Sequence, residues 1–227
     1  MVDVKFLSQV PIFAHLEPEQ LQSLNDKLRP RRYQRGEVIF HEDDAGDRLH
    51  IIVEGNVKLS VSSEDGREKT VALFKPGECL GEMDLLDGST RSATATAMDA
   101  VETLGLMRDD FMDVVAKNPQ VAADINRLLT RQLRNVNQML ADAAFLDVPT
   151  RVAKQLLTLA SGDTGDANPA GPQVVPLGHY ELASLVGAGR ETVSRALNSY
   201  RRMGILTTFH RRIVINDSKG LERMAAL

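Results

Sequence analysis

The spacing of hydrophobic positions along this 227-residue chain changes twice, and each change predicts a different kind of structure. Residues 5–30 carry their apolar side chains in short groups at helical spacing. Glycines then recur at 36, 46, 55, 66, 77 and 88, and short apolar runs such as 49–53 and 57–61 lie between them. Such evenly spaced short strands are typical of an antiparallel barrel or jelly roll. We predict hairpin turns at Gly55-Asn56 and Asp65-Gly66.

After Asn118-Pro119 the spacing becomes that of one long helix, which we expect to end near Ala144. Its apolar residues step by four, three, four and three, the heptad pattern of a coiled coil, at Leu129, Leu133, Val136, Leu140 and Ala143. Two copies of the helix are therefore expected to pair. The alternative is a single amphipathic helix that packs on its own barrel.

A second helix is expected to start immediately afterwards. Asp147 and Pro149 have the character of a helix cap and a first-turn proline, which predicts a helix over 149–159 and leaves 145–148 as a hinge. The stretch 161–172 is rich in turn-forming and polar residues and predicts an exposed loop.

Residues 180–202 have the pattern of helix, tight turn and helix, with Gly187-Ala188-Gly189 as the turn. In the second helix Val193, Ala196, Leu197 and Tyr200 recur every three or four residues and should face inward. The opposite face then carries Arg190, Glu191, Ser194 and Arg195.

These exposed residue types suit recognition of base edges in the major groove of DNA. An arginine can donate two hydrogen bonds to guanine, and a glutamate can accept one from cytosine, when both project from a helix N-terminus. The alternative is an ordinary exposed helix in which Glu191 and Arg195 form an i,i+4 ion pair. Beyond the helix, apolar runs flank His210-Arg211-Arg212, which predicts a hairpin whose basic tip contacts phosphates.

Charge and composition narrow the functional classes. The net charge is −4, but residues 149–227 hold ten Lys and Arg against six Asp and Glu, whereas residues 1–148 hold 17 against 25. A basic C-terminal part on an acidic N-terminal part suits a protein that meets DNA with its C-terminal part only. The single cysteine, Cys79, excludes an internal disulfide and a four-cysteine iron–sulfur cluster.

The sequence also disfavours a membrane protein, a secreted protein and an enzyme. No apolar run is long enough to span a bilayer, and Met1–Lys5 lack the character of a secretory signal, so we expect a cytoplasmic protein without a membrane partner. The sequence shows no nucleophile paired with a base, no cluster of metal ligands and no phosphate-binding loop of nucleotide hydrolases. We therefore expect neither enzyme activity nor a bound metal.

Residues 81–93 form the candidate ligand site within the barrel region. They combine a glycine that allows close approach of backbone, the carboxylate of Glu82, and Arg91 followed by small residues whose N–H groups can surround an anion. The alternative is a Glu82–Arg91 salt bridge inside the barrel. We interpret Asp84 as a turn carboxylate and Cys79 as a small buried hydrophobe.

The run Gly187-Ala188-Gly189-Arg190-Glu191-Thr192-Val193-Ser194-Arg195 resembles the helix-turn-helix signature of the CRP/FNR superfamily of bacterial transcription regulators. The resemblance extends over essentially the whole chain. It implies an α+β protein with an N-terminal jelly-roll cyclic-nucleotide-binding domain over 1–118, a dimerisation helix over 119–144 and a C-terminal winged helix-turn-helix domain over 145–227. The family usually has serine where this chain has Gly189, so one phosphate contact is missing.

The resemblance also assigns roles to residues of the candidate ligand site. Glu82 would hold a ribose 2′-hydroxyl and Arg91 a cyclic phosphate, and the cradle around that phosphate would be formed by Gly81, Ser92 and Ala93. The base would be contacted from the long helix, at positions occupied here by Val136 and Asn137. Asn137 fits that role, but Val136 cannot form a hydrogen bond, and Gln132 stands where some members have arginine.

For DNA, the resemblance implies that a dimer reads a palindrome with TGTGA-like half-sites. Arg190, Glu191 and Arg195 would read bases, with Ser194 on the same face, while Thr192 and Arg211 would hold the backbone. The effector would be cyclic AMP or a related cyclic nucleotide, and the loop over 161–172 would contact RNA polymerase or serve as a plain connector. Two alternatives remain: a ligand-independent regulator in which Val136 seals the dimer, and a cyclic-nucleotide-responsive regulatory subunit of an enzyme.

Overall fold

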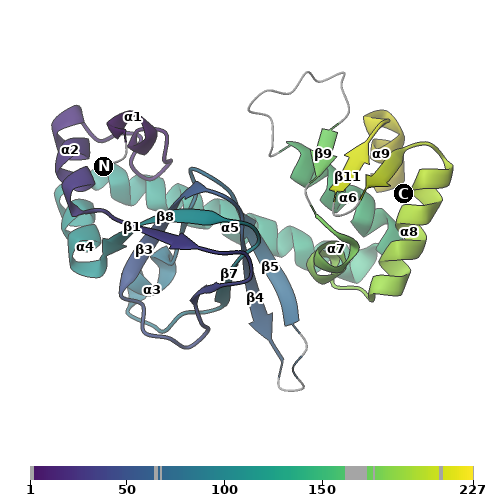
Figure 1. Ribbon diagram of the computed structural model, residues 1–227, viewed down its shortest axis with the longest axis horizontal. Helices are drawn as coiled ribbons and strands as arrows, with labels where there is room; N and C mark the ends of the chain where they lie inside the picture. The colour runs from purple at the N-terminus through teal and green to yellow at the C-terminus, as the bar shows by residue number, and fades with distance from the viewer. Residues whose placement is uncertain are drawn as a thin grey trace. The chain divides into compact units, whose positions relative to one another are not determined.

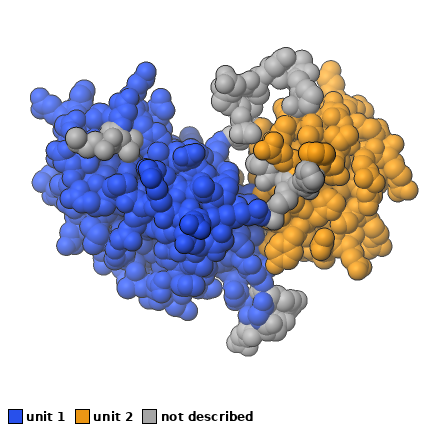
Figure 2. All heavy atoms as spheres, in the orientation of Figure 1, with its two compact units in different colours: residues 1–134 blue, residues 135–227 orange. Residues whose placement is uncertain are grey.

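The computed structural model describes residues 3–63, 66, 68–161, 173–175, 177–209 and 212–226. The chain divides into two compact units, residues 1–134 and 135–227, which Figure 2 shows in different colours. Within the described ranges no helix is both long and apolar enough to cross a membrane.

The first unit begins with two short helices, α1 (Val4–Leu7) and α2 (Pro18–Lys27). A capping box starts α2, in which the backbone N–H of Glu17 donates to the Gln20 side chain at 2.9 Å. The buried face of these helices joins the main core of the unit, together with Phe13 and Phe111. The helical pattern predicted for residues 5–30 is thus confirmed as two short helices, except that Arg29 and Pro30 already belong to a strand.

Two four-stranded antiparallel sheets follow, labelled in Figure 1. The first has the order β1-β8-β3-β6, formed by Arg29–Tyr33, Val101–Met107, Arg48–Glu54 and Cys79–Leu80. The second has the order β2-β7-β4-β5, formed by Val38–Phe40, Thr94–Ala97, Val57–Ser62 and Glu68–Phe74. The predicted antiparallel barrel or jelly roll is confirmed.

The prediction of a hairpin at Gly55-Asn56 is wrong, because β3 and β4 belong to different sheets. The segment is a corner where the chain crosses from one sheet to the other. Gly55 adopts a left-handed backbone (φ 84°), and the backbone N–H of Asn56 donates to the Asp99 carboxylate at 2.7 Å. The second predicted turn does join paired strands, β4 and β5, although residues 64, 65 and 67 lie outside the described ranges.

Three helices complete this part of the chain: α3 (Glu82–Asp87), α4 (Arg108–Lys117) and α5 (Pro119–Phe145). The predicted long helix is therefore confirmed. Its first turns pack on the core of the first unit through Val121 and Ile125, with Leu129 against the edge of that core. Farther along, Leu133, Val136 and Leu140 are exposed.

The second unit combines packed helices with a small sheet. Its helices are α6 (Val148–Ser161), α7 (His179–Val186), α8 (Arg190–Arg202) and α9 (Ser218–Ala225). Its antiparallel sheet has the order β10-β11-β9, formed by Leu206–Phe209, Arg212–Ile215 and Gln173–Val175. The predicted helix-turn-helix and wing hairpin are confirmed, but the wing tip with Arg211 and the loop over 162–172 lie outside the described residues.

The predicted cap between α5 and α6 is present. The backbone N–H of Thr150 donates to the Asp147 carboxylate at 2.9 Å. Pro149 lies in the first turn of α6, which begins one residue earlier than predicted, at Val148. The helical ladder is therefore interrupted between Phe145 and Val148, within the stretch predicted as a hinge.

Candidate DNA-binding and ligand sites

The sequence forces a sharp turn between α7 and α8. Gly187 ends α7 with a left-handed backbone (φ 65°), and the N–H of Ala188 donates back to the carbonyl of Ala183 at 3.1 Å. Gly189 then precedes the first residue of α8 without a side chain to cap it. On the inner face of α8 the predicted set is buried, namely Val193, Ala196, Leu197 and Tyr200.

α8 is fixed to α6 by polar contacts as well as by this apolar face. The hydroxyl of Tyr200 donates to the carbonyl of Pro149 at 2.9 Å, and burial raises the pKa of Tyr200 to about 12, so the hydroxyl stays a donor. The guanidinium of Arg151 donates to the carbonyl of Val186, at the end of α7, at 2.7 Å. The start of α6 thus holds both helices of the pair.

The outer face of α8 presents charged side chains to solvent. Arg190, Glu191 and Arg195 are exposed, and no ion pair joins Glu191 to Arg195 in the described part of the chain. Arg195 instead donates to the hydroxyl of Thr192 at 3.2 Å. The alternative of an ordinary i,i+4 pair is therefore wrong.

Ser194 differs from the other residues of this face. It is half-buried, and its hydroxyl lies 3.0 Å from Nδ1 of His179, at the start of α7. Burial lowers the pKa of His179, and the positive charge of Arg190 adds to the effect. The serine is thus engaged within the helix pair, and this contact was not predicted from the helical spacing.

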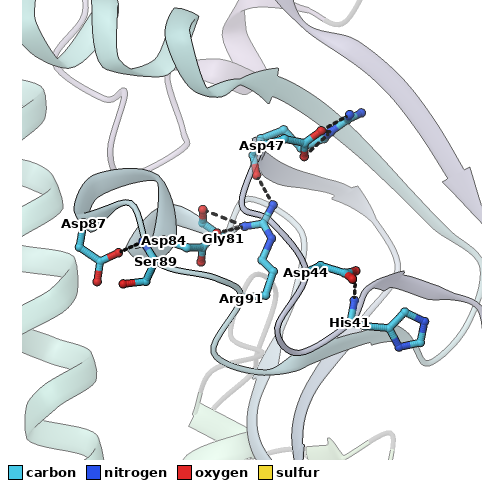
Figure 3. Close-up of polar contacts among 9 residues, drawn as sticks. His41, Asp44, Asp47, Gly81, Asp84, Asp87, Ser89 and Arg91 are labelled. Carbon is cyan, nitrogen blue, oxygen red and sulfur yellow. Dashed lines mark hydrogen bonds and ion pairs between the residues drawn. The ribbon is translucent and has the colours of Figure 1, made fainter.

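At the candidate ligand site, the Arg91 side chain is almost wholly buried in the first unit, and its guanidinium binds neighbouring groups of the chain (Figure 3). It forms an ion pair with Asp84, and it donates to the carbonyl of Gly81 at 3.1 Å and to the carbonyl of Arg48 at 2.7 Å. Its guanidinium carbon also lies 4.2 Å from the centre of the Phe40 ring, a cation–π distance.

Gly81 cannot be replaced without disturbing this arrangement. Its backbone is left-handed (φ 84°), and a Cβ at this position would collide with the Arg91 guanidinium. The glycine thus allows a close approach, but the group that approaches is the arginine of the chain itself, and close approach of a ligand stays a prediction. Of the two residues after Arg91, Ser92 is exposed and Ala93 is buried.

Glu82 is buried beside this cluster but does not pair with Arg91. It accepts a hydrogen bond from the Gln132 side chain of α5 at 3.2 Å. Burial raises the pKa of Glu82. The alternative of a Glu82–Arg91 salt bridge is wrong, since the arginine takes Asp84 as its partner.

The interpretation of Asp84 as a turn carboxylate is also wrong. Asp84 lies within α3, is buried, and forms the ion pair that neutralises Arg91. Burial raises its pKa, and the charge of Arg91 opposes that rise. The sequence did contain a signal, because three acidic residues, Glu82, Asp84 and Asp87, precede the single arginine of this segment.

Several further residues bear on the candidate sites. Val136 and Asn137 are exposed on the part of α5 that belongs to the second unit. Cys79 is buried, as predicted, and burial raises the pKa of its thiol. His50 lies in β3 with its ring 5.8 Å from that of Phe40, and burial lowers its pKa to about 3. No group of three potential metal ligands occurs among the described residues.

Comparison with known proteins agrees with both halves of this architecture. Residues 30–118 match the model of the cyclic nucleotide-binding domain, and residues 150–224 match that of the Crp-like helix-turn-helix domain. A CRP-like cAMP-activated global transcriptional regulator of Mycobacterium tuberculosis is 36% identical over 221 residues, covering 97% of this chain and 99% of the relative.

Two proteins of Thermus thermophilus extend the comparison. Its cyclic AMP receptor protein is 34% identical, over 95% of this chain and 96% of the relative. The crystal structure of a CRP-family transcriptional regulator is 30% identical, with a TM-score of 0.72 over 87% of this chain and 97% of that one. With a cyclic nucleotide-binding domain, a Crp-like helix-turn-helix domain and relatives matched over nearly their full lengths, the chain belongs to the CRP/FNR family of transcription regulators.

Proposed function

We propose that this regulator binds a palindrome with TGTGA-like half-sites as a homodimer and that a cyclic nucleotide gates the binding. The observation that carries the DNA part is the first turn of α8, where Arg190 and Glu191 are exposed and unpaired within the described residues. Charged groups held on a rigid helix without internal partners are available for base edges. Arg195 would read a further base, Ser194 lies on the same helix, and contacts to phosphates would come from Thr192 and Arg211.

Some residues at the candidate ligand site have the chemistry that an anionic sugar phosphate requires. Among the described residues, two buried side-chain nitrogen atoms lack a hydrogen-bond partner, namely Nε of Arg91 and Nε of Arg151. A buried N–H without an acceptor at Arg91 favours an incoming anion. Arg91, Ser92 and the N–H of Ala93 would hold the cyclic phosphate beside Gly81, and Glu82 would hold the ribose hydroxyl.

The apolar seam of α5 supports the homodimer. Leu133, Val136 and Leu140 are exposed at heptad spacing, and a second copy of the helix would cover them. A dimer would also place two α8 helices about one turn of duplex apart, which is the geometry that a palindrome requires. Val136 and Asn137 would meet the nucleotide base at this seam.

The proposed division of labour follows from these roles. Residues 1–118 would sense the ligand, 119–144 would dimerise, and 145–227 would bind DNA after rotation about 145–148. A protein that binds chromosomal DNA would be located in the cytoplasm. There the loop over 161–172 would contact RNA polymerase. Relatives named as cAMP-activated regulators support cyclic AMP as the effector.

A ligand-independent regulator of the same fold is the second candidate, and one observation favours it. Val136 stands at the base-contacting position, and its side chain neither donates nor accepts a hydrogen bond. In that case its burial at the seam would stabilise an active dimer without nucleotide.

Calorimetry separates the two candidates. The purified full-length chain is titrated with cyclic AMP and, in parallel, with cyclic GMP, while its affinity for a TGTGA palindrome is measured at fixed salt. Binding that tightens the DNA complex supports gating. Tight DNA binding with no heat from either nucleotide supports the ligand-independent regulator, and no preference for the palindrome over random DNA contradicts both.

A further inference from the structure

The ion pair between Arg91 and Asp84 is the most deeply buried charge pair described in the first unit. The two side chains are only 2% and 5% exposed. An isolated guanidinium in such surroundings would be strongly destabilising, so a buried arginine requires an opposite charge. Asp84 supplies that charge from within the chain.

The position of Asp84 is set by close packing. It projects from α3 toward the loop that contains Gly46, where a Cβ would collide with its carboxylate. The absence of a side chain at Gly46 leaves room for the carboxylate, and the ion pair holds it against Nη1 of Arg91. On the same guanidinium Nε has no partner, so the arginine retains one buried donor for another anion.

A ligand phosphate at Arg91 would bring a second negative charge to a cation that is already neutralised. Two anions around one buried cation repel each other strongly, because little solvent screens them. We propose that Asp84 is an internal counter-anion that a ligand phosphate must displace, and that it thereby sets the affinity of this site for cyclic nucleotides. The proposal rests on the proposed function of residues 81–93 as the nucleotide site.

The fold provides a route by which this displacement reaches α5. α3 is flanked by Gly81 and Gly88, both with left-handed backbones (φ 84° and 77°), so the helix lies between two residues that tolerate unusual dihedrals. The same helix carries Glu82, whose carboxylate accepts from Gln132 on α5. Release of Asp84 would therefore loosen the helix that holds Glu82 against α5.

The test compares Asp84→Asn with a matched control, Asp87→Asn, in the full-length chain. Both substitutions remove one negative charge from α3, but Asp87 is exposed and accepts from the backbone N–H of Ser89 at 2.9 Å, away from the Arg91 ion pair. Cyclic AMP is the probe, and calorimetry gives its dissociation constant for each chain. We expect Asp84→Asn to bind at least about tenfold more tightly than the unchanged chain, and Asp87→Asn to stay within about twofold.

Stability is measured in parallel, because loss of a buried partner can unfold a protein. Asp84→Ser is a second variant, and thermal unfolding with and without cyclic AMP reports ligand binding through the stabilisation it produces. A ligand that replaces the lost counter-charge should raise the melting temperature of either Asp84 variant by more than that of the unchanged chain.

The outcomes are distinct. The counter-anion proposal is overturned if the unchanged chain binds cyclic AMP and the Asp84 variants bind it no more tightly and are stabilised by it no more. That result leaves the proposal of a ligand-gated regulator intact. Binding only in the Asp84 variants supports the proposal in its strongest form. If no chain binds cyclic AMP at millimolar concentration, gating by cyclic AMP fails and the counter-anion fails with it.

Discussion

The exposed seam of α5 permits a quantitative test of the homodimer through Leu140→Ala. Leu133 and Leu140 are 60% and 65% exposed, which leaves most of each side chain for a partner to cover. Alanine is the strongest helix former, so the substitution should preserve α5 while it removes the apolar contact. Any loss of association can then be assigned to the seam.

The expected magnitude follows from the carbon atoms that are lost. Leu→Ala removes three carbons, worth roughly 0.8 kcal/mol each when fully buried. Because about a third of Leu140 is already covered in the single chain, the loss is about 1.5 kcal/mol per protomer. Two protomers lose about 3 kcal/mol, which weakens dimerisation roughly a hundredfold.

Sedimentation equilibrium over a range of protein concentrations measures this change. The control is Met107→Ala, which also shortens an exposed apolar side chain but lies at the end of β8, outside the helix. Its dimerisation should match that of the unchanged chain. The seam is refuted as the dimer contact if Leu140→Ala associates as tightly as the control, or if the unchanged chain is monomeric at micromolar concentration.

Three further predictions concern other parts of the molecule. Arg190→Ala should cost about 1–3 kcal/mol on the palindrome and less on random DNA in fluorescence anisotropy, and equal losses on both would contradict base recognition. Gly189→Ser should tighten binding to both DNAs by roughly two- to fivefold through a new phosphate contact. The backbone of Gly189 (φ −63°) suits serine, and a Cβ at this position would meet nothing within 4 Å. Unchanged affinity for DNA would contradict the new contact. Burial lowers the pKa of His50 to about 3, so between pH 7 and pH 5 this histidine takes up a proton in the unfolded chain but not in the folded one. The free energy of unfolding should therefore fall by about 2 kcal/mol over that range. Denaturant unfolding of His50→Gln should show a smaller loss over that range, and an identical loss would exclude the histidine as its source.

The sequence predicted the regular elements because their signals are local. Heptad spacing, a capped helix start and glycine turns depend on neighbours a few residues away, and α5, α6 and α8 accordingly lie where they were expected. Gly55-Asn56 failed as a hairpin for the opposite reason. A turn signal in the sequence indicates that the chain reverses direction. Which strands then pair depends on contacts across the barrel, and here the backbone N–H of Asn56 contacts the Asp99 carboxylate.

The candidate ligand site was predicted in its residue types but not in its internal pairing. Glu82 and Arg91 were correctly placed inside the fold, yet which acid neutralises the arginine depends on the path of α3 and the loop at Gly46. Both acids lie within ten residues of Arg91, so sequence distance could not distinguish them. The choice was made by packing, which brings Asp84 to Arg91 and leaves Glu82 with Gln132.

The boundary between the two units falls inside α5, between Arg134 and Asn135, and this restricts how such a protein can be re-engineered or can exchange its sensor. Each residue inserted into a helix turns everything beyond it by about 100° and advances it by about 1.5 Å. A chimaera joined here with one extra residue would therefore present the wrong side of the helix at the seam. Insertions of seven residues nearly restore the phase, so functional fusions should cluster at whole heptads.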